Sequence, residues 1–182
     1  MHRLAGGQSA ETLALLTIAE AGDHIVASPS LYGGTYNLLH YTFPKLGIQT
    51  TFVSQSKVDD WHAAVRPNTR LLFAETPTNP LTDVCDIAAL ADIAHDAGAL
   101  LTVDNTFCSP MVQRPLEHGA HMVMHSATKY LNGHSDMVGG VIVVGDDAGL
   151  AEQMTFLQNA VGGVQGPFDS FLALRGIKTL HL

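Results

Sequence analysis

The strongest constraint on the fold is an alternation of two kinds of segment along the whole chain. Short apolar runs rich in β-branched residues alternate with longer segments whose apolar residues recur at helical spacing. The expected strands are residues 24–28, 49–53, 70–75, 99–104, 121–126 and 140–145, and the expected helices are residues 8–21, 34–46, 57–65, 87–97 and 148–160. This alternation is typical of βαβ units, so we predict an α/β fold with a mostly parallel central sheet and flanking helices.

Length and composition narrow the class of protein. A chain of 182 residues fits one domain, or a large part of one, and can bury a substantial core. Its hydrophobic content of 46% and charged content of 14% exclude a disordered chain. The net charge of −8, with no basic run or basic face to offset it, argues against nucleic acid as a partner.

The cysteines and the first residues indicate the cellular compartment in which the protein is expected. Cys85 and Cys108 form neither a metal-ligand motif nor a disulfide framework, as expected in a reducing compartment. The start MHRLAGGQSAE has no apolar stretch of the kind found in secretion signals, and no segment approaches the length of a membrane span. We therefore predict a cytoplasmic protein that has no membrane partner.

Polar residues close three successive strands of the expected sheet. Glu75, Asp104 and Ser126 each end an apolar run, and the loops that follow are TPTNP, NTFCSP and ATK. In an open α/β sheet, ligands bind beyond the carboxyl ends of the strands. The three strand ends therefore predict one functional rim.

A lysine lies at this rim, within HSATKYLNGHSDMVGG (residues 125–140), although the chain has only nine Lys and Arg residues. A lysine placed between apolar strands loses part of its solvation, which favours the neutral, nucleophilic amine. Such an amine can form a Schiff base with an aldehyde. Lys129 is therefore the candidate nucleophile.

The neighbouring segments match the needs of one aldehyde cofactor, pyridoxal 5′-phosphate (PLP). Asp104 can face the pyridine nitrogen, and Tyr32 in SLYGGT can stack on the ring. Ser126 and Thr128 offer hydroxyl donors to a phosphate, and residues 5–11 (AGGQSAE) place glycines at a helix start, where free N–H groups favour an anion. Each feature alone has an ordinary structural explanation, such as a turn or a helix cap. Their joint occurrence favours PLP.

Four segments carry a resemblance to a known family. The lysine segment at 125–140, ETPTNP (75–80), VDNTFCSP (103–110) and SLYGGTYNLL (30–39) resemble stretches of the Cys/Met metabolism group of PLP-dependent enzymes. The resemblance covers nearly the whole chain. The resemblance implies the large domain of the aspartate aminotransferase-like fold, also called fold type I.

The resemblance also implies roles for individual residues. Lys129 would carry the PLP aldehyde and act in catalysis, Asp104 would contact the pyridine nitrogen, and Asn79 would bond near the ring hydroxyl. Tyr32 would stack on the ring and assist the leaving group. The residues implied for the phosphate are Gly7, Gln8, Ser126 and Thr128. The family usually has serine where this chain has Gly6, but backbone donors at the next two residues do not depend on that side chain.

The implied activity is a reaction at Cγ of a sulfur or homoserine-ester amino acid, by elimination or replacement. The second half of the chain, which carries the lysine, most resembles cystathionine γ-lyases and γ-synthases. The first half most resembles O-acetylhomoserine sulfhydrylases, which make homocysteine, and this is the alternative. The implied substrates are cystathionine, O-acyl-homoserine, cysteine or sulfide, and the implied assembly is a homodimer or homotetramer.

The family's chains extend further at both ends. Residues 1–182 would then correspond to the PLP-binding large domain, without the N-terminal segment and the C-terminal small domain. Apolar surface that those parts cover would be exposed. Arg175 is predicted to be structural, not the arginine that grips the substrate carboxylate. A non-catalytic cofactor-binding fragment is therefore the alternative from another functional class.

Metal binding is a further alternative, because His118, His121 and His125 lie close together in the sequence. On a strand, His121 and His125 would share a face. No third ligand follows at a spacing typical of zinc, so we predict no metal site.

Overall fold

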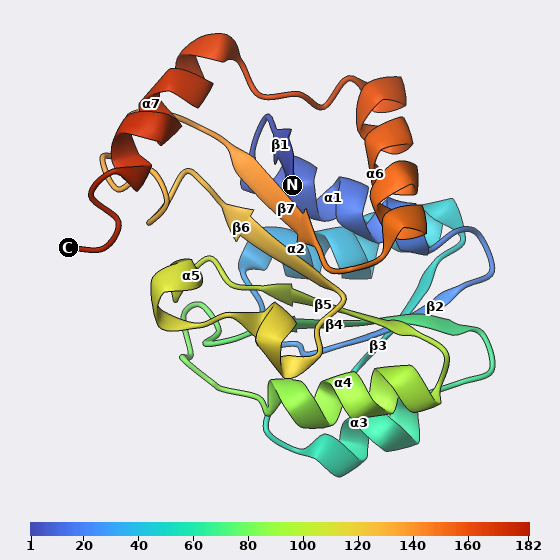
Figure 1. Cartoon of the computed structure of the whole chain (residues 1–182). Coiled ribbons are helices and arrows are strands. Elements are labelled where there is room, and N and C mark those ends of the chain that lie inside the picture. Colours follow the sequence, from blue (N-terminus) through green and yellow to red (C-terminus); the bar gives the residue numbers. More distant parts are fainter.

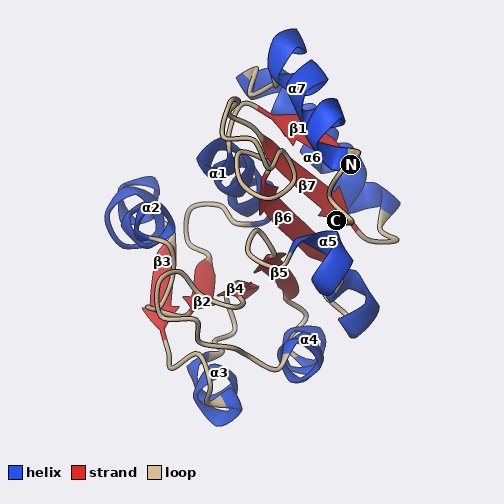
Figure 2. Ribbon diagram, turned by 90° about the vertical axis from the view of Figure 1, so that its left-hand side faces the viewer, coloured by secondary structure: helices blue, strands red, loops and turns tan.

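The computed structural model describes residues 1–182 and consists of one seven-stranded sheet with helices on both faces (Figures 1 and 2). The strand order is β1-β7-β6-β5-β4-β2-β3. The strands are β1 (His2–Leu4), β2 (His24–Ala27), β3 (Gln49–Phe52), β4 (Thr69–Glu75), β5 (Leu100–Asp104), β6 (Met122–Ser126) and β7 (Gly140–Val144). All six strands expected from the sequence are present, with bounds within one residue of those expected.

The sheet is mixed and mostly parallel, as predicted. The strands β3, β2, β4, β5 and β6 run parallel to their neighbours, whereas β7 pairs antiparallel with both β6 and β1. The edge strand β1 was not expected, because its three residues are too few to show a periodic pattern. The carboxyl ends of β2, β4, β5 and β6 consequently lie at one edge of the sheet.

Seven α-helices connect or flank the strands. They are α1 (Gly7–Ile18), α2 (Gly33–Asn37), α3 (Val58–Ala64), α4 (Ile87–Asp96), α5 (Ser109–Val112), α6 (Ala148–Val161) and α7 (Pro167–Ile177). A 3-10 turn at Pro115–His118 precedes β6. None of these helices combines the length and the apolar character that crossing a membrane requires.

The single helix expected at residues 34–46 is wrong. The segment divides into α2, a π-helical turn at Leu38–Thr42 and a 3-10 turn at Phe43–Leu46. Pro44 lacks the N–H group that a continuing α-helix needs, and Gly47 ends the segment in the left-handed conformation at φ 79°.

The core lies in two layers, one on each face of the sheet. Helices α3 and α4 cover one face, while α1 and α6 lie on the other (Figure 1). Trp61 of α3 and Leu90 of α4 belong to the core of the first face, and Leu4, Met122 and Met154 belong to that of the second. Each fully buried large apolar side chain contributes about 1.5–3 kcal/mol, so both layers hold the sheet rigid beneath the strand ends.

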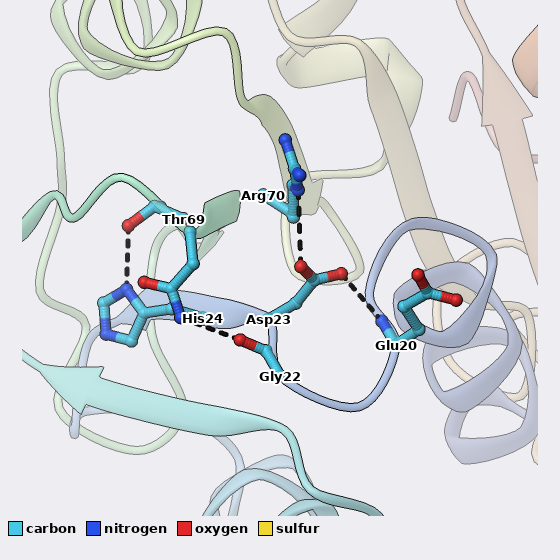
Figure 3. Close-up of polar contacts among 7 residues, drawn as sticks. Glu20, Gly22, Asp23, His24, Thr69 and Arg70 are labelled. Atoms are coloured by element: carbon cyan, nitrogen blue, oxygen red, sulfur yellow. Dashed lines mark hydrogen bonds and ion pairs between the residues drawn. The ribbon is translucent and has the colours of Figure 1, made fainter.

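A polar cluster fixes the amino end of β2, opposite the rim (Figure 3). The fully buried His24 ring contacts the Thr69 hydroxyl at 2.8 Å through Nδ1 and the Thr51 hydroxyl at 2.8 Å through Nε2. Beside it, Asp23 pairs with Arg70 at 3.3 Å. Burial lowers the pKa of His24 to about 4, so the ring is neutral at physiological pH.

Candidate functional site

A cavity of about 1190 Å³ opens at the carboxyl ends of the strands. Glu75, Asp104 and Ser126 all line it, from the ends of β4, β5 and β6. Glu75 and Asp104 are direct neighbours in the register of the two parallel strands. The three polar strand ends therefore meet at one cavity, as predicted, and the function of this rim stays a prediction.

The cavity also brings together every residue that the sequence analysis proposed for the site. These residues come from the start of α1, from the ends of β5 and β6, and from the loops that follow β2, β4 and β6. They are Gly7, Gln8, Tyr32, Asn79, Asp104, Ser126, Thr128 and Lys129.

Lys129 lies in the turn that follows β6. Its backbone N–H donates to the Ser126 carbonyl at 3.1 Å, and its own carbonyl accepts from Gly133 at 2.8 Å. The side chain is exposed, so the expectation of a lysine desolvated between apolar strands is wrong. The reason is that β6 ends at Ser126, three residues earlier, and the turn carries Lys129 out over the open cavity. A molecule filling the cavity would cover this amine.

Asp104 is a buried acid with one oxygen left for a partner. Its Oδ1 accepts from the Thr106 N–H at 2.9 Å and from the Thr106 hydroxyl at 2.5 Å. No hydrogen bond within the chain occupies Oδ2. Burial raises the pKa of Asp104 to about 6, against the bonds from Thr106. A cationic N–H group beside Oδ2 would offset the cost of burying the carboxylate.

Glu75 joins two loops of the rim. Its Oε2 accepts from the Tyr32 N–H at 2.7 Å and its Oε1 accepts from the Asn79 N–H at 2.8 Å. Burial, and secondly the nearby Asp104, raises the pKa of Glu75 to about 7. Each oxygen thus fixes the backbone of one residue predicted to contact the ring, and the side chains of Tyr32 and Asn79 remain free to face the cavity.

The start of α1 forms a cradle for an anion. Gly6 is the N-cap and supplies no side chain to bond the free N–H groups of the first turn. A Cβ on Gly7 would lie 2.7 Å from the Ser126 side chain, so only glycine permits this approach of helix to strand end. The N–H groups and the Ser126 hydroxyl therefore face the same space, which suits a phosphate.

Thr128 is more constrained than the other predicted phosphate residues. Its hydroxyl donates to the Gly139 carbonyl at 3.2 Å and accepts from the Gly139 N–H at 3.1 Å. To donate to a phosphate it would have to turn its proton away from that carbonyl. The Ser126 hydroxyl has no such internal bond.

The loop beyond Lys129 is fastened to α7. Arg175 contacts both carboxylate oxygens of Asp136, at 2.8 Å each, and Asn132 donates to the same carboxylate at 3.0 Å. The hydrogen bond from Arg175 holds the pKa of Asp136 at about 2. Arg175 thus supports the lysine loop, in agreement with the structural role predicted for it.

Sequence reasoning missed several side chains of the cavity, among them Glu11 and Thr106. Glu11 is the only charged residue of α1 and lies one helical turn after Gly7, so the two share a face. That spacing was the signal that could have identified it. Thr106 lines the cavity two residues beyond Asp104, and its role as a donor to that carboxylate depends on a loop conformation that spacing does not reveal.

Two of the three histidines considered for a metal, His121 and His125, have places within the fold. His121 Nδ1 accepts from the Leu101 N–H at 3.0 Å. His125 is buried on β6, and burial lowers its pKa to about 4. No group of three or more His, Cys, Asp or Glu side chains lies in an arrangement that could hold a metal ion.

The chain is similar to a family of known enzymes over nearly its whole length. The family model described as "Cys/Met metabolism PLP-dependent enzyme" matches residues 2–182. A cystathionine γ-lyase of Bacillus subtilis is 49% identical over 181 residues, which is 100% of this chain and 47% of that protein. An O-acetyl-L-homoserine sulfhydrylase of Leptospira meyeri is 56% identical over 141 residues, or 78% of this chain and 32% of that protein.

The fold has close counterparts among solved structures. The crystal structure of cystathionine γ-lyase from Lactobacillus plantarum, complexed with L-serine, superposes with a TM-score of 0.95 at 41% identity. The match covers 98% of this chain and 46% of that one. The chain thus spans about half the length of the relatives it matches.

Proposed function

This chain belongs to the Cys/Met metabolism family of PLP-dependent enzymes, and we propose that residues 1–182 form the cofactor-binding large domain of such an enzyme. The family implies PLP as the cofactor. The observation that carries the proposal is the convergence of all eight predicted site residues on one cavity. The 0.95 TM-score over 98% of the chain supports the same assignment.

The cavity has two parts that fit the two ends of PLP. The start of α1, with Gly7 and Gln8, and the hydroxyls of Ser126 and Thr128 would hold the phosphate. A dianionic group is well placed there, because helix N–H groups and hydroxyls are all donors.

The opposite part of the cavity would hold the ring. Asp104 Oδ2 would accept from the protonated pyridine nitrogen, Tyr32 would lie on the ring face, and the Asn79 amide would bond near the ring hydroxyl. Lys129 would bind the cofactor aldehyde from the turn after β6.

Bound PLP supplies an electron sink for negative charge that develops at Cα of an amino-acid substrate. The amine of Lys129 would act as the general base that takes the Cα proton of the substrate. The buried Asp104 would keep the ring nitrogen protonated, which would sustain the electron sink. The Tyr32 phenol assists departure of the group on Cγ. These roles divide proton transfer between the two residues predicted to be catalytic, Lys129 and Tyr32.

The reaction we propose is γ-elimination or γ-replacement on a sulfur or homoserine-ester amino acid, of the cystathionine γ-lyase or γ-synthase type. The 49% identity to the Bacillus subtilis lyase, which extends over 100% of this chain and 47% of that protein, supports it. The 56% identity to the Leptospira meyeri sulfhydrylase favours, as a second candidate, homocysteine synthesis from O-acetylhomoserine and sulfide. Because the chain spans less than half of these proteins, a cofactor-binding fragment without turnover is the third candidate.

We include a homo-oligomer, a dimer or tetramer, in the proposal. Several large apolar side chains of α6 and α7 are exposed, as expected for surface that another copy or a further domain covers. They are Phe156, Phe168, Phe171 and Leu174. Sedimentation analysis tests the assembly.

The free thiols of Cys85 and Cys108 support a reducing compartment, and we propose the cytoplasm.

The test is covalent trapping of the cofactor. Purified protein is incubated with PLP, reduced with borohydride and digested, and the modified peptide is identified by mass spectrometry. We expect a visible absorption band before reduction and a PLP adduct on Lys129 after it. Lys129→Ala should lose both, whereas Lys45→Ala, which changes an exposed lysine of the 3-10 turn, should keep both.

The outcomes separate the candidates. An adduct on Lys129, together with release of an oxo acid from cystathionine, supports the lyase reading. An adduct together with homocysteine formation from O-acetylhomoserine and sulfide supports the sulfhydrylase reading. An adduct with neither product identifies a binding fragment, and folded protein that forms no adduct contradicts the proposal.

A further inference from the structure

Glu11 is a buried carboxyl that the proposed chemistry does not use. It lies on α1, one helical turn after Gly7, is 0% exposed and lines the cofactor cavity. No lysine, arginine or histidine pairs with it. A carboxyl buried without a cation needs either several hydrogen-bond donors or a proton of its own.

The hydrogen bonds of Glu11 join two helices, but only through one of its oxygens. Oε2 accepts from the Gln8 amide at 2.9 Å and from the Thr35 hydroxyl of α2 at 2.8 Å. Oε1 is buried and has no partner. If Glu11 is neutral, Oε2, which accepts both hydrogen bonds, is the carbonyl oxygen, and Oε1 carries the proton. The hydrogen-bonding pattern fits this neutral form.

The bond from Gln8 extends this link to Tyr32. A Cβ on Gly34 would collide with Gln8 Oε1 and would lie 2.7 Å from the Tyr32 ring. The side chains of Gln8 and Tyr32 therefore both pack on Gly34. Glu11 holds Gln8 by accepting a hydrogen bond from the Gln8 amide. It holds the turn that carries Tyr32 by accepting a hydrogen bond from the Thr35 hydroxyl.

We propose that Glu11, as a neutral acid, is a positioning residue that locks the anion-binding start of α1 to the turn that carries Tyr32. The phosphate cradle and the ring-stacking side chain then form one rigid wall of the cavity. This inference rests on the proposed function for its effect on PLP, but the lock itself exists without cofactor.

The surroundings of Glu11 support the neutral form. Burial raises the pKa of Glu11 to about 8, against the bonds from Gln8 and Thr35, and Asp104 and Glu75 raise it further. Asp104 on β5 and Glu75 on β4 are the titratable groups that act on it, and Lys129 is the cation that lines the same cavity. Above about pH 8, ionisation would place an unpaired charge on Oε1, in the cavity that receives the phosphate.

Three variants test the lock. Glu11→Gln reproduces the neutral acid, with its carbonyl accepting both bonds. Glu11→Leu and Thr35→Val remove the bonds while keeping the size of the side chain. Glu152→Gln, on the exposed face of α6, is the matched control. The dissociation constant for PLP is measured by titration at about pH 7 and about pH 9. Hydrogen exchange of residues 30–38 is measured by mass spectrometry without PLP.

We expect Glu11→Leu to weaken PLP binding at least about tenfold and to speed exchange in the Tyr32 turn, with Thr35→Val intermediate. Glu11→Gln should bind like wild type at about pH 7 and should lose less affinity than wild type at about pH 9. Unchanged exchange in Glu11→Leu refutes the lock, and an equal loss of affinity in wild type and Glu11→Gln refutes the neutral form. Wild type that binds no PLP refutes the proposed function instead, while the exchange measurement still decides the lock.

Discussion

Arg175 on α7 and Asp136 in the loop after Lys129 form a two-pronged ion pair, with two contacts of 2.8 Å. The two side chains are half-exposed, at 38% and 39%, so the pair adds little to the free energy of unfolding. Its main effect is to fix the geometry of the loop. Planar guanidinium and carboxylate groups that meet in this way fix each other's orientation. The pair thereby holds the loop that follows the proposed nucleophile.

Replacing Arg175 should therefore loosen the lysine loop without unfolding the protein. In Arg175→Ala we expect faster hydrogen exchange over residues 129–138 and faster loss of bound PLP, because Asp136 and Asn132 lose their common partner. Arg114→Ala is the matched control, since Arg114 forms an exposed pair with Glu117 at 3.0 Å away from the cavity. Equal exchange in both variants would show that the ion pair does not hold the loop.

Glu75→Gln should destabilise the protein because the amide cannot serve both backbone donors. The carboxylate accepts one N–H on each oxygen, whereas glutamine keeps a single acceptor and turns an NH₂ group toward the N–H of Tyr32 or Asn79. An unsatisfied buried donor costs about 1–3 kcal/mol. Denaturant unfolding measures the change, with the exposed Glu20→Gln as control. A loss no larger than that of the control would mean that water replaces the missing bond.

The sequence predicted the rim because each of its parts is a local pattern. Apolar β-branched runs fix the strands, and the polar residue that ends a run, such as Asp104, must lie at the carboxyl edge of a parallel sheet. No long-range contact is needed for this inference. The same holds for Gly6 and Gly7 at the start of α1, where glycine leaves the helix N–H groups open.

Features set by tertiary contacts could not be predicted in this way. The solvent exposure of Lys129 depends on where β6 ends, and the role of Glu75 depends on two loops that meet only in the folded chain. The division of residues 34–46 into three kinds of helix differs from these, because Pro44 and Gly47 were local signals for it that apolar periodicity alone does not report. Glu11 had a readable position on α1, but its partner Thr35 lies on another helix.

Gly7→Ala should displace α1 from the end of β6. The new Cβ would lie 2.7 Å from the Ser126 side chain and 3.2 Å from its Cα, so the backbone must move. Overpacking of this kind costs about 1–3 kcal/mol and would open the phosphate cradle. We expect a lower melting temperature and at least about tenfold weaker PLP binding.

The control for this variant is Gly33→Ala, whose Cβ would meet nothing within 4 Å although it lies beside Tyr32. It should bind PLP as wild type does. If Gly7→Ala behaves like this control, the close approach of α1 to β6 is not needed for the cradle.

His24 should make a contribution to the free energy of unfolding that depends on pH, because its pKa differs between the folded and unfolded states. Burial, and secondly Arg66, lowers its pKa to about 4 in the folded state, whereas the unfolded chain titrates at the ordinary value of 6.5. As pH falls below 6.5, the unfolded state binds the proton first, so the contribution of His24 to the free energy of unfolding decreases until about pH 4. His24 contributes a loss of roughly 1–2 kcal/mol by about pH 5.

His24→Asn isolates this contribution from the buried carboxyls, whose raised pKa values act in the opposite direction. At about pH 7.5 the variant should be less stable than wild type, because the bonds to Thr51 and Thr69 are lost. By about pH 5 the difference should narrow, since asparagine takes up no proton. Denaturant titrations across this range measure it, with the exposed His95→Asn as control. A difference that stays constant with pH would mean that His24 is not held neutral by the fold.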